Sequence, residues 1–303
     1  MINKRYFLLF FSLCALQVIG QQTADKVSIP RLDKPTYDSK NSPQVYIDQN
    51  HNNFHQKSGR FQPFADLLVA DGYQVDSITK LKRLNKSDIL VISNPINQKN
   101  VGNWQRPIYA AFNEDEISNI KNWVKNGGKL LLIADHMPFA GASNTLANAF
   151  GFNFCDGFAN LDKEQNNQPD VFSNENKRLV SSEITDGTLG GKLDAITTFT
   201  GSSFTIPKEA KGIFKFLKED VCLAPEIAWQ FNETTVSTNL KDSYQGAILK
   251  YGQGKIAVFG EAAMFTAQTI TNNSGVFKVG FHSSQAPNNI QFIRNLMFWL
   301  SKE

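Results

Sequence analysis

An α/β fold, in which a parallel sheet is flanked by helices, is predicted by the order of strand and helix patterns along the chain. Short apolar strand segments alternate with amphipathic helix segments before residue 150, and the sheet pattern returns after residue 250. The strand expected at 129–134 is apolar on both faces, as central strands of parallel sheets are. These observations predict a flavodoxin-like sheet with a β-rich insertion.

The first half of the chain supplies most elements of this predicted sheet. Strands are expected at 45–47, 73–75, 88–93 and 129–134, and a helix at 61–70. Asn113 and Glu116 have the spacing of a capping box, so another helix is expected between Asn113 and the exit at Gly127 and Gly128. A short helix is expected at 145–150.

The second half of the chain has a different sequence pattern. Threonine-rich and aromatic stretches between Asn- and Lys-rich loops predict a β-rich insertion at about 155–245. A hairpin-like pair at 247–260 returns to the sheet, and a closing helix is expected at about 288–300. One domain over residues 43–303 fits this length.

Residues 1–20 have the pattern of a secretory signal peptide. Lys4 and Arg5 precede an apolar run from Tyr6 to Leu16, and small residues follow near Gly20. The apolar run is shorter than the roughly 20 residues that span a bilayer. We expect a mature chain that begins near Gln21 with an extended lead-in over 21–42, is periplasmic or secreted, and has no membrane attachment after leader removal.

Composition excludes some partners. The chain has 31 Lys and Arg against 28 Asp and Glu, which leaves no basic footprint for nucleic acid. Outside the leader it has two cysteines, Cys155 and Cys222, which either pair in an oxidising compartment or remain buried thiols.

One segment resembles a known enzyme class. The stretch GGKLLLIADHMPFAGASNTLANAFGF, at 127–152, resembles the elbow region of class I glutamine amidotransferases. With VYIDQNHNNFH and IAVFGEAAMFTAQ, it makes the chain similar to the secreted bacterial amidotransferase-like family of unknown function. The catalytic enzymes carry a Cys nucleophile at the elbow, where this chain has Asp135 and His136. The resemblance therefore implies that glutaminase activity is absent.

Polar residues gather after the predicted strands. Three of the four histidines do so, and open α/β sheets bind ligands at the carboxyl ends of their strands. We therefore expect one crevice, formed by Asp48, His51, His55, Asp135, His136 and Glu261. In the alternative interpretation, the two aspartates cap the following helices and the histidines hydrogen-bond loop backbone.

Two functions fit these residues. In the first, the protein is a binding or accessory module for a small molecule or a glycan, and Trp104 and Arg106 could stack on a sugar. In the second, it is a metal-assisted hydrolase with Asp135, His136 and Glu261 as catalytic residues. Its metal, a divalent transition ion, would be held by Asp48, His51, His55 and His136. The sequence does not separate the two.

Overall fold

The computed structural model of the chain describes residues 21–25, 29, 32–38, 42–161, 169–272 and 275–302. The predicted signal peptide at 1–20 lies outside the described residues. Strands dominate the regular structure, and the described ranges contain four α-helices: α1 (Gln62–Ala70), α2 (Glu114–Lys125), α3 (Phe139–Asn148) and α4 (Asn289–Ser301). Three short 3-10 helices accompany them: η1 (Leu81–Arg83), η2 (Gln98–Asn100) and η3 (Ala263–Phe265).

The largest sheet has nine strands, eight of them in the order β3-β2-β4-β5-β15-β14-β10-β6, with β11 also paired to β14. Five neighbouring strands are parallel: β2 (Gln44–Asp48), β3 (Gln74–Ile78), β4 (Ile89–Ser93), β5 (Lys129–Ile133) and β15 (Gly254–Phe259). The other four pair antiparallel: β6 (Asn153–Phe154), β10 (Phe204–Thr205), β11 (Lys211–Lys215) and β14 (Tyr244–Tyr251).

The predicted flavodoxin-like parallel sheet is therefore wrong, because the sheet is mixed and the chain is rich in β-structure. A tight hairpin between Tyr251 and Gly254 turns β14 back along β15. Parallel pairing needs a long crossover, usually a helix, and the described residues between α3 and α4 contain no α-helix. The strands that this stretch adds before β15, namely β6, β10, β11 and β14, consequently pair antiparallel.

The described residues form three smaller sheets as well. The first contains β1 (Gln21–Ala24), β16 (Ala267–Asn272) and β17 (Gly275–Gly280), so the predicted lead-in begins as a paired strand. The second contains β7 (Phe158–Asn160), β12 (Val221–Ala224) and β13 (Val236–Asn239), which with the segment 225–235 we call the β-lobe. The third pairs β8 (Asp170–Ser173) with β9 (Ala195–Thr198).

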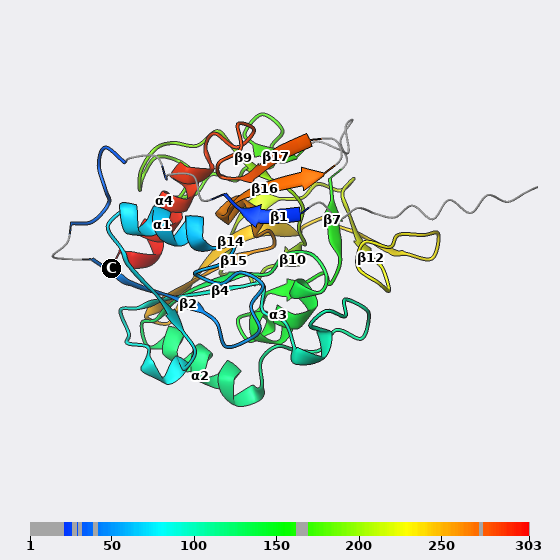
Figure 1. The fold of residues 1–303 in the computed structure, drawn as a ribbon, viewed down its shortest axis with the longest axis horizontal. Helices are drawn as coiled ribbons and strands as arrows, with labels where there is room; N and C mark the ends of the chain where they lie inside the picture. Colours follow the sequence, from blue (N-terminus) through cyan, green and yellow to red (C-terminus); the bar gives the residue numbers. More distant parts are fainter. Residues whose placement is uncertain are drawn as a thin grey trace, which may run out of the picture.

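The parallel strands lie between two helical layers (Figure 1). Helices α1 and α4 pack on one face, and α2 and α3 on the other. Side chains alternate along β5 accordingly: Leu131 and Ile133 join the first core, and Leu130 and Leu132 join the second. None of the helices in the described part of the chain combines the length and hydropathy that a bilayer span requires.

The start of α2 confirms the capping prediction. The Asn113 side chain accepts a hydrogen bond from the backbone N–H of Glu116, and the Glu116 carboxylate accepts one from the backbone N–H of Asn113. By contrast, α3 begins at Phe139 rather than near residue 145, which shortens the turn after β5 to five residues, 134–138. Asp135 and His136 therefore lie in a compact turn.

Candidate functional site

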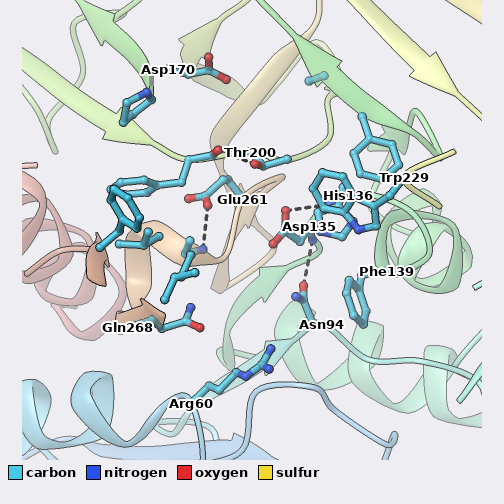
Figure 2. A pocket seen from close by; sticks show the side chains of 18 of the residues that line it. Arg60, Asn94, Asp135, His136, Phe139, Asp170, Thr200, Trp229, Glu261 and Gln268 are labelled. Carbon is cyan, nitrogen blue, oxygen red and sulfur yellow. Dashed lines mark hydrogen bonds between the residues drawn. The ribbon is translucent and has the colours of Figure 1, made fainter. Parts of the chain in front are cut away.

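A cavity of about 2230 Å³ opens at the carboxyl ends of the parallel strands. Its floor, as we use the term, is Asn94 after β4, Asp135 after β5 and Glu261 after β15. The three strands are adjacent and parallel, so their first loop residues emerge at one edge. The predicted gathering of Asp135, His136 and Glu261 is what the structure shows (Figure 2).

Asn94 fixes the position of Asp135. Its side-chain oxygen accepts a hydrogen bond of 2.9 Å from the backbone N–H of Asp135, and its backbone has a left-handed φ of 46°. Oδ1 of Asp135 accepts a hydrogen bond of 2.8 Å from the backbone N–H of His136. The Asp135 carboxylate is partly exposed and faces the cavity (Figure 2).

Glu261 is almost completely buried at the end of β15. Its two carboxyl oxygens accept hydrogen bonds from the backbone N–H groups of Ala263, at 2.8 Å, and Met264, at 2.7 Å. Glu261 thus satisfies the first backbone N–H groups of η3, a structural role that was not predicted from the sequence. Burial and, next, the charge of Asp135 raise the pKa of Glu261 well above its usual range.

His136 belongs to an aromatic surface. Its Nδ1 lies 2.6 Å from the Met137 carbonyl oxygen, which can only accept, so Nδ1 carries the proton. The ring stacks on Phe158 at a centroid distance of 4.7 Å and meets the edge of Trp229 at 4.7 Å. We call Phe158, Trp229 and Phe231, which pack together in the β-lobe, the wall of the cavity.

His55 lines the cavity, and two contacts fix the position of its ring. Its Nδ1 is 3.1 Å from Ser93 Oγ, and its ring stacks on Phe61 at 4.8 Å. Burial, followed by the charges of Arg60 and His136, lowers the pKa of His55 to about 3. The imidazole is therefore neutral at neutral pH.

Asp48 and His51 do not line the cavity, which corrects the predicted six-residue crevice. His51 Nδ1 lies 2.7 Å from Asp48 Oδ2, and its Nε2 lies 3.4 Å from Glu116 Oε1. Burial alone would lower the pKa of His51, but the hydrogen bond and charge of Asp48 and the charge of Glu116 together raise it. Asp48 and His51 are kept out of the cavity by a local contact, because residues three positions apart can pair with each other directly.

The predicted metal ligands are therefore not assembled. Within the described ranges, no group of three or more His, Cys, Asp and Glu side chains has a geometry that could hold a metal ion. Asp48 and His51 pair with each other, His55 contacts Ser93, and His136 packs in the aromatic surface.

Several lining residues were missed or misplaced by sequence reasoning. Trp104 lines the cavity as suggested, but Arg106 does not, because it pairs with Asp156 at 2.6 Å. Arg60, Trp229 and Gln268 were not anticipated. Trp229 and Phe231 stand in a short polar loop, and an aromatic pair in such a loop was the one available signal.

Comparisons with known proteins show the fold only. No protein-family model and no curated protein sequence matches the chain. Among solved structures, the chain is similar to the mmIFT52 N-terminal domain, with 12% identity and a TM-score of 0.54 over 86% of this chain and 98% of that chain.

Two further structures are more distant. The Cytoplasmic Protein STM1381 from Salmonella typhimurium LT2 is 13% identical, with a TM-score of 0.46 over 86% of this chain and 97% of that one. The exo-beta-1,4-mannosidase Op5Man5 from Opitutaceae bacterium strain TAV5 is 12% identical, with a TM-score of 0.39 over 73% of this chain and 31% of that one. None of these comparisons supports the amidotransferase-like resemblance.

Proposed function

We propose that the protein binds a saccharide in this cavity, as a periplasmic or secreted binding protein. The observation that carries the proposal is the wall: Trp229 and Phe231 remain 44% and 45% exposed in a cavity that also has a polar floor. Apolar ring faces on one side and hydrogen-bonding groups on the other match the two kinds of surface that a sugar ring presents.

Trp229 is held in an unusual conformation. Its φ is 68°, in the left-handed region that bulky residues rarely adopt. Strained residues of this kind concentrate at binding sites, where the surrounding structure holds them. The backbone of Trp229 is held in this conformation while its indole lines the cavity, which supports a ligand-binding role.

Another part of the cavity lining supplies one acceptor without a partner, on Gln268. Gln268 is 2% exposed and donates from Nε2 to Thr266 Oγ1 at 2.7 Å, while its buried Oε1 has no hydrogen-bond partner in the described part of the chain. A buried polar atom without a partner costs free energy that a ligand hydroxyl would recover. Saccharides carry many hydroxyl donors.

The cavity size favours an oligosaccharide. Its volume of about 2230 Å³ exceeds the roughly 300 to 1,000 Å³ that is common for small-molecule sites. Several sugar rings could therefore bind between the floor and the wall.

The compartment is supported by the cysteines. Cys155 and Cys222 form a disulfide, which persists in oxidising compartments outside the cytosol. The pair also leaves neither thiol available as a nucleophile. The binding role uses Asp135, His136 and Glu261 as polar contacts and requires no reaction from them.

The experiment is calorimetric titration of purified protein with a panel of oligosaccharides. We expect saturable binding, and Trp229→Ala should weaken it about tenfold. Tyr109→Ala is the matched control, because Tyr109 is also 40% exposed but does not line the cavity. Absence of saccharide binding, or equal effects of the two substitutions, would contradict the proposal.

A further inference from the structure

Arg60 enters the cavity from the segment that connects β2 to α1. Its side chain is half-buried and points toward the space that Asp135 and Glu261 also face (Figure 2). Its guanidinium carbon lies 4.1 Å from the centroid of the Phe54 ring, a cation–π contact that holds the group in place.

No acidic side chain in the described ranges lies within ion-pair distance of Arg60. The other buried or half-buried arginines of these ranges each pair with an aspartate: Arg106 with Asp156, Arg178 with Asp220, and Arg294 with Asp71. Arg60 is thus the exception among them.

Lys278, the other lysine or arginine of the described lining, has a carboxylate partner. Lys278 Nζ and His282 Nδ1 lie 3.4 Å and 2.9 Å from the same carboxylate oxygen of Asp25. His55, next to Arg60, has its pKa lowered to about 3 and is neutral. Arg60 is therefore the one lysine or arginine among the described lining residues that has no carboxylate partner.

Partial burial of this charge is costly. Burial lowers the pKa of Arg60, yet an arginine stays protonated in proteins, so the charge must be borne. A charged group removed from water without a partner is stabilised by an anion, and the planar guanidinium fork matches a carboxylate in a bidentate arrangement.

We propose that Arg60 makes the cavity selective for acidic saccharides, by binding the carboxylate of a uronic acid residue. This proposal rests on the proposed function and names the chemical class of its ligand. The carboxylate would lie on the Arg60 side, because Asp135 would repel an anion at the floor. The floor and the wall would then contact neutral parts of the same oligosaccharide.

The test is calorimetric titration of the whole protein with three uronic acid oligomers, of galacturonate, glucuronate and mannuronate. Each is compared with its carboxyl-reduced form, in which CH2OH replaces the carboxylate on the same backbone. At least one acidic oligomer should bind about 10- to 100-fold more tightly than its reduced form. Arg60→Gln should abolish the preference, and Arg60→Lys should retain part of it.

Arg83→Gln is the matched control, because Arg83 is exposed and outside the cavity. It should leave the preference unchanged, and thermal melts should show that each variant is folded. Equal binding of acidic and reduced oligomers would overturn the role of Arg60 and leave saccharide binding intact. A preference for sulfated oligomers over the uronates would overturn the carboxylate assignment. Absence of binding to every oligomer would overturn the proposed function as well.

Discussion

The strands that carry the cavity floor pack between two helical layers, whereas the β-lobe that carries the wall is joined to the molecule by a few strong links. Core side chains of β4, β5 and β15 are inaccessible to solvent on both faces of the sheet. The β-lobe is linked to its surroundings by the Cys155–Cys222 disulfide, by the hydrogen bond that Arg106 donates to the Pro225 carbonyl oxygen, and by the Arg178–Asp220 pair directly before β12. The comparison indicates that sheet packing places the polar floor, while specific cross-links place the aromatic wall.

The largest effect is expected on the floor side, from His55. Its folded pKa of about 3 lies below the ordinary value of 6.5, so the unfolded chain binds more protons between these pH values. The neutral His55 ring therefore contributes roughly 4 to 5 kcal/mol to the free energy of unfolding above pH 6.5. This contribution is lost as the pH falls from 6.5 toward 3.

The measurement is an NMR titration of the histidine rings at pH values where the protein remains folded. His55 should stay neutral down to pH 5. His51, in the same loop, is the internal control, because its pKa is raised and its ring should be charged below pH 6.5. A His55 ring that titrates near 6.5 would contradict this account of the buried floor.

The next effect concerns the β-lobe. Arg178 and Asp220 form a buried bidentate pair just before β12, and Arg178→Met would remove the guanidinium from the buried Asp220 carboxylate. We expect the free energy of unfolding, measured by urea denaturation, to fall by roughly 3 to 5 kcal/mol. Lys192→Met removes an exposed ion pair and should have no resolvable effect. Equal effects of the two would contradict the expected importance of the buried link.

Removal of the disulfide should affect the wall more than the floor. The disulfide joins residues 67 positions apart, so replacing both cysteines by serine should lower the free energy of unfolding by roughly 2 to 4 kcal/mol. Hydrogen exchange should speed up across β7 and β12 and remain slow in β5. Chemical reduction of the wild-type protein is the control and should reproduce both results. Uniform loss of protection would show that floor and wall form one cooperative unit.

The sequence predicted the floor better than the wall, for a physical reason. Apolar runs identify buried strands, and the residues that end adjacent parallel strands must meet, so Asp135 and Glu261 could be placed together. The direction of β14 depended on a hairpin whose consequence for the whole sheet was not foreseen. Trp229 and Arg60 come from turns, and no periodicity shows where a turn residue points.

Local pairing explains the remaining errors in the site. The Asp48–His51 contact forms within one loop, and a three-residue separation gave no sign that it would exclude both from the cavity. Glu116, on α2, adds a partner that only the tertiary structure reveals. The predicted metal ligands do not come together, because each of these side chains contacts a different neighbour.

A crystal structure of the protein with an oligosaccharide that calorimetry shows to bind would test saccharide binding in the cavity most directly. We expect a sugar ring against the exposed face of Trp229 and a ligand hydroxyl within hydrogen-bond distance of Gln268 Oε1. An oligosaccharide bound away from the cavity, with Trp229 and Gln268 untouched, would contradict the account.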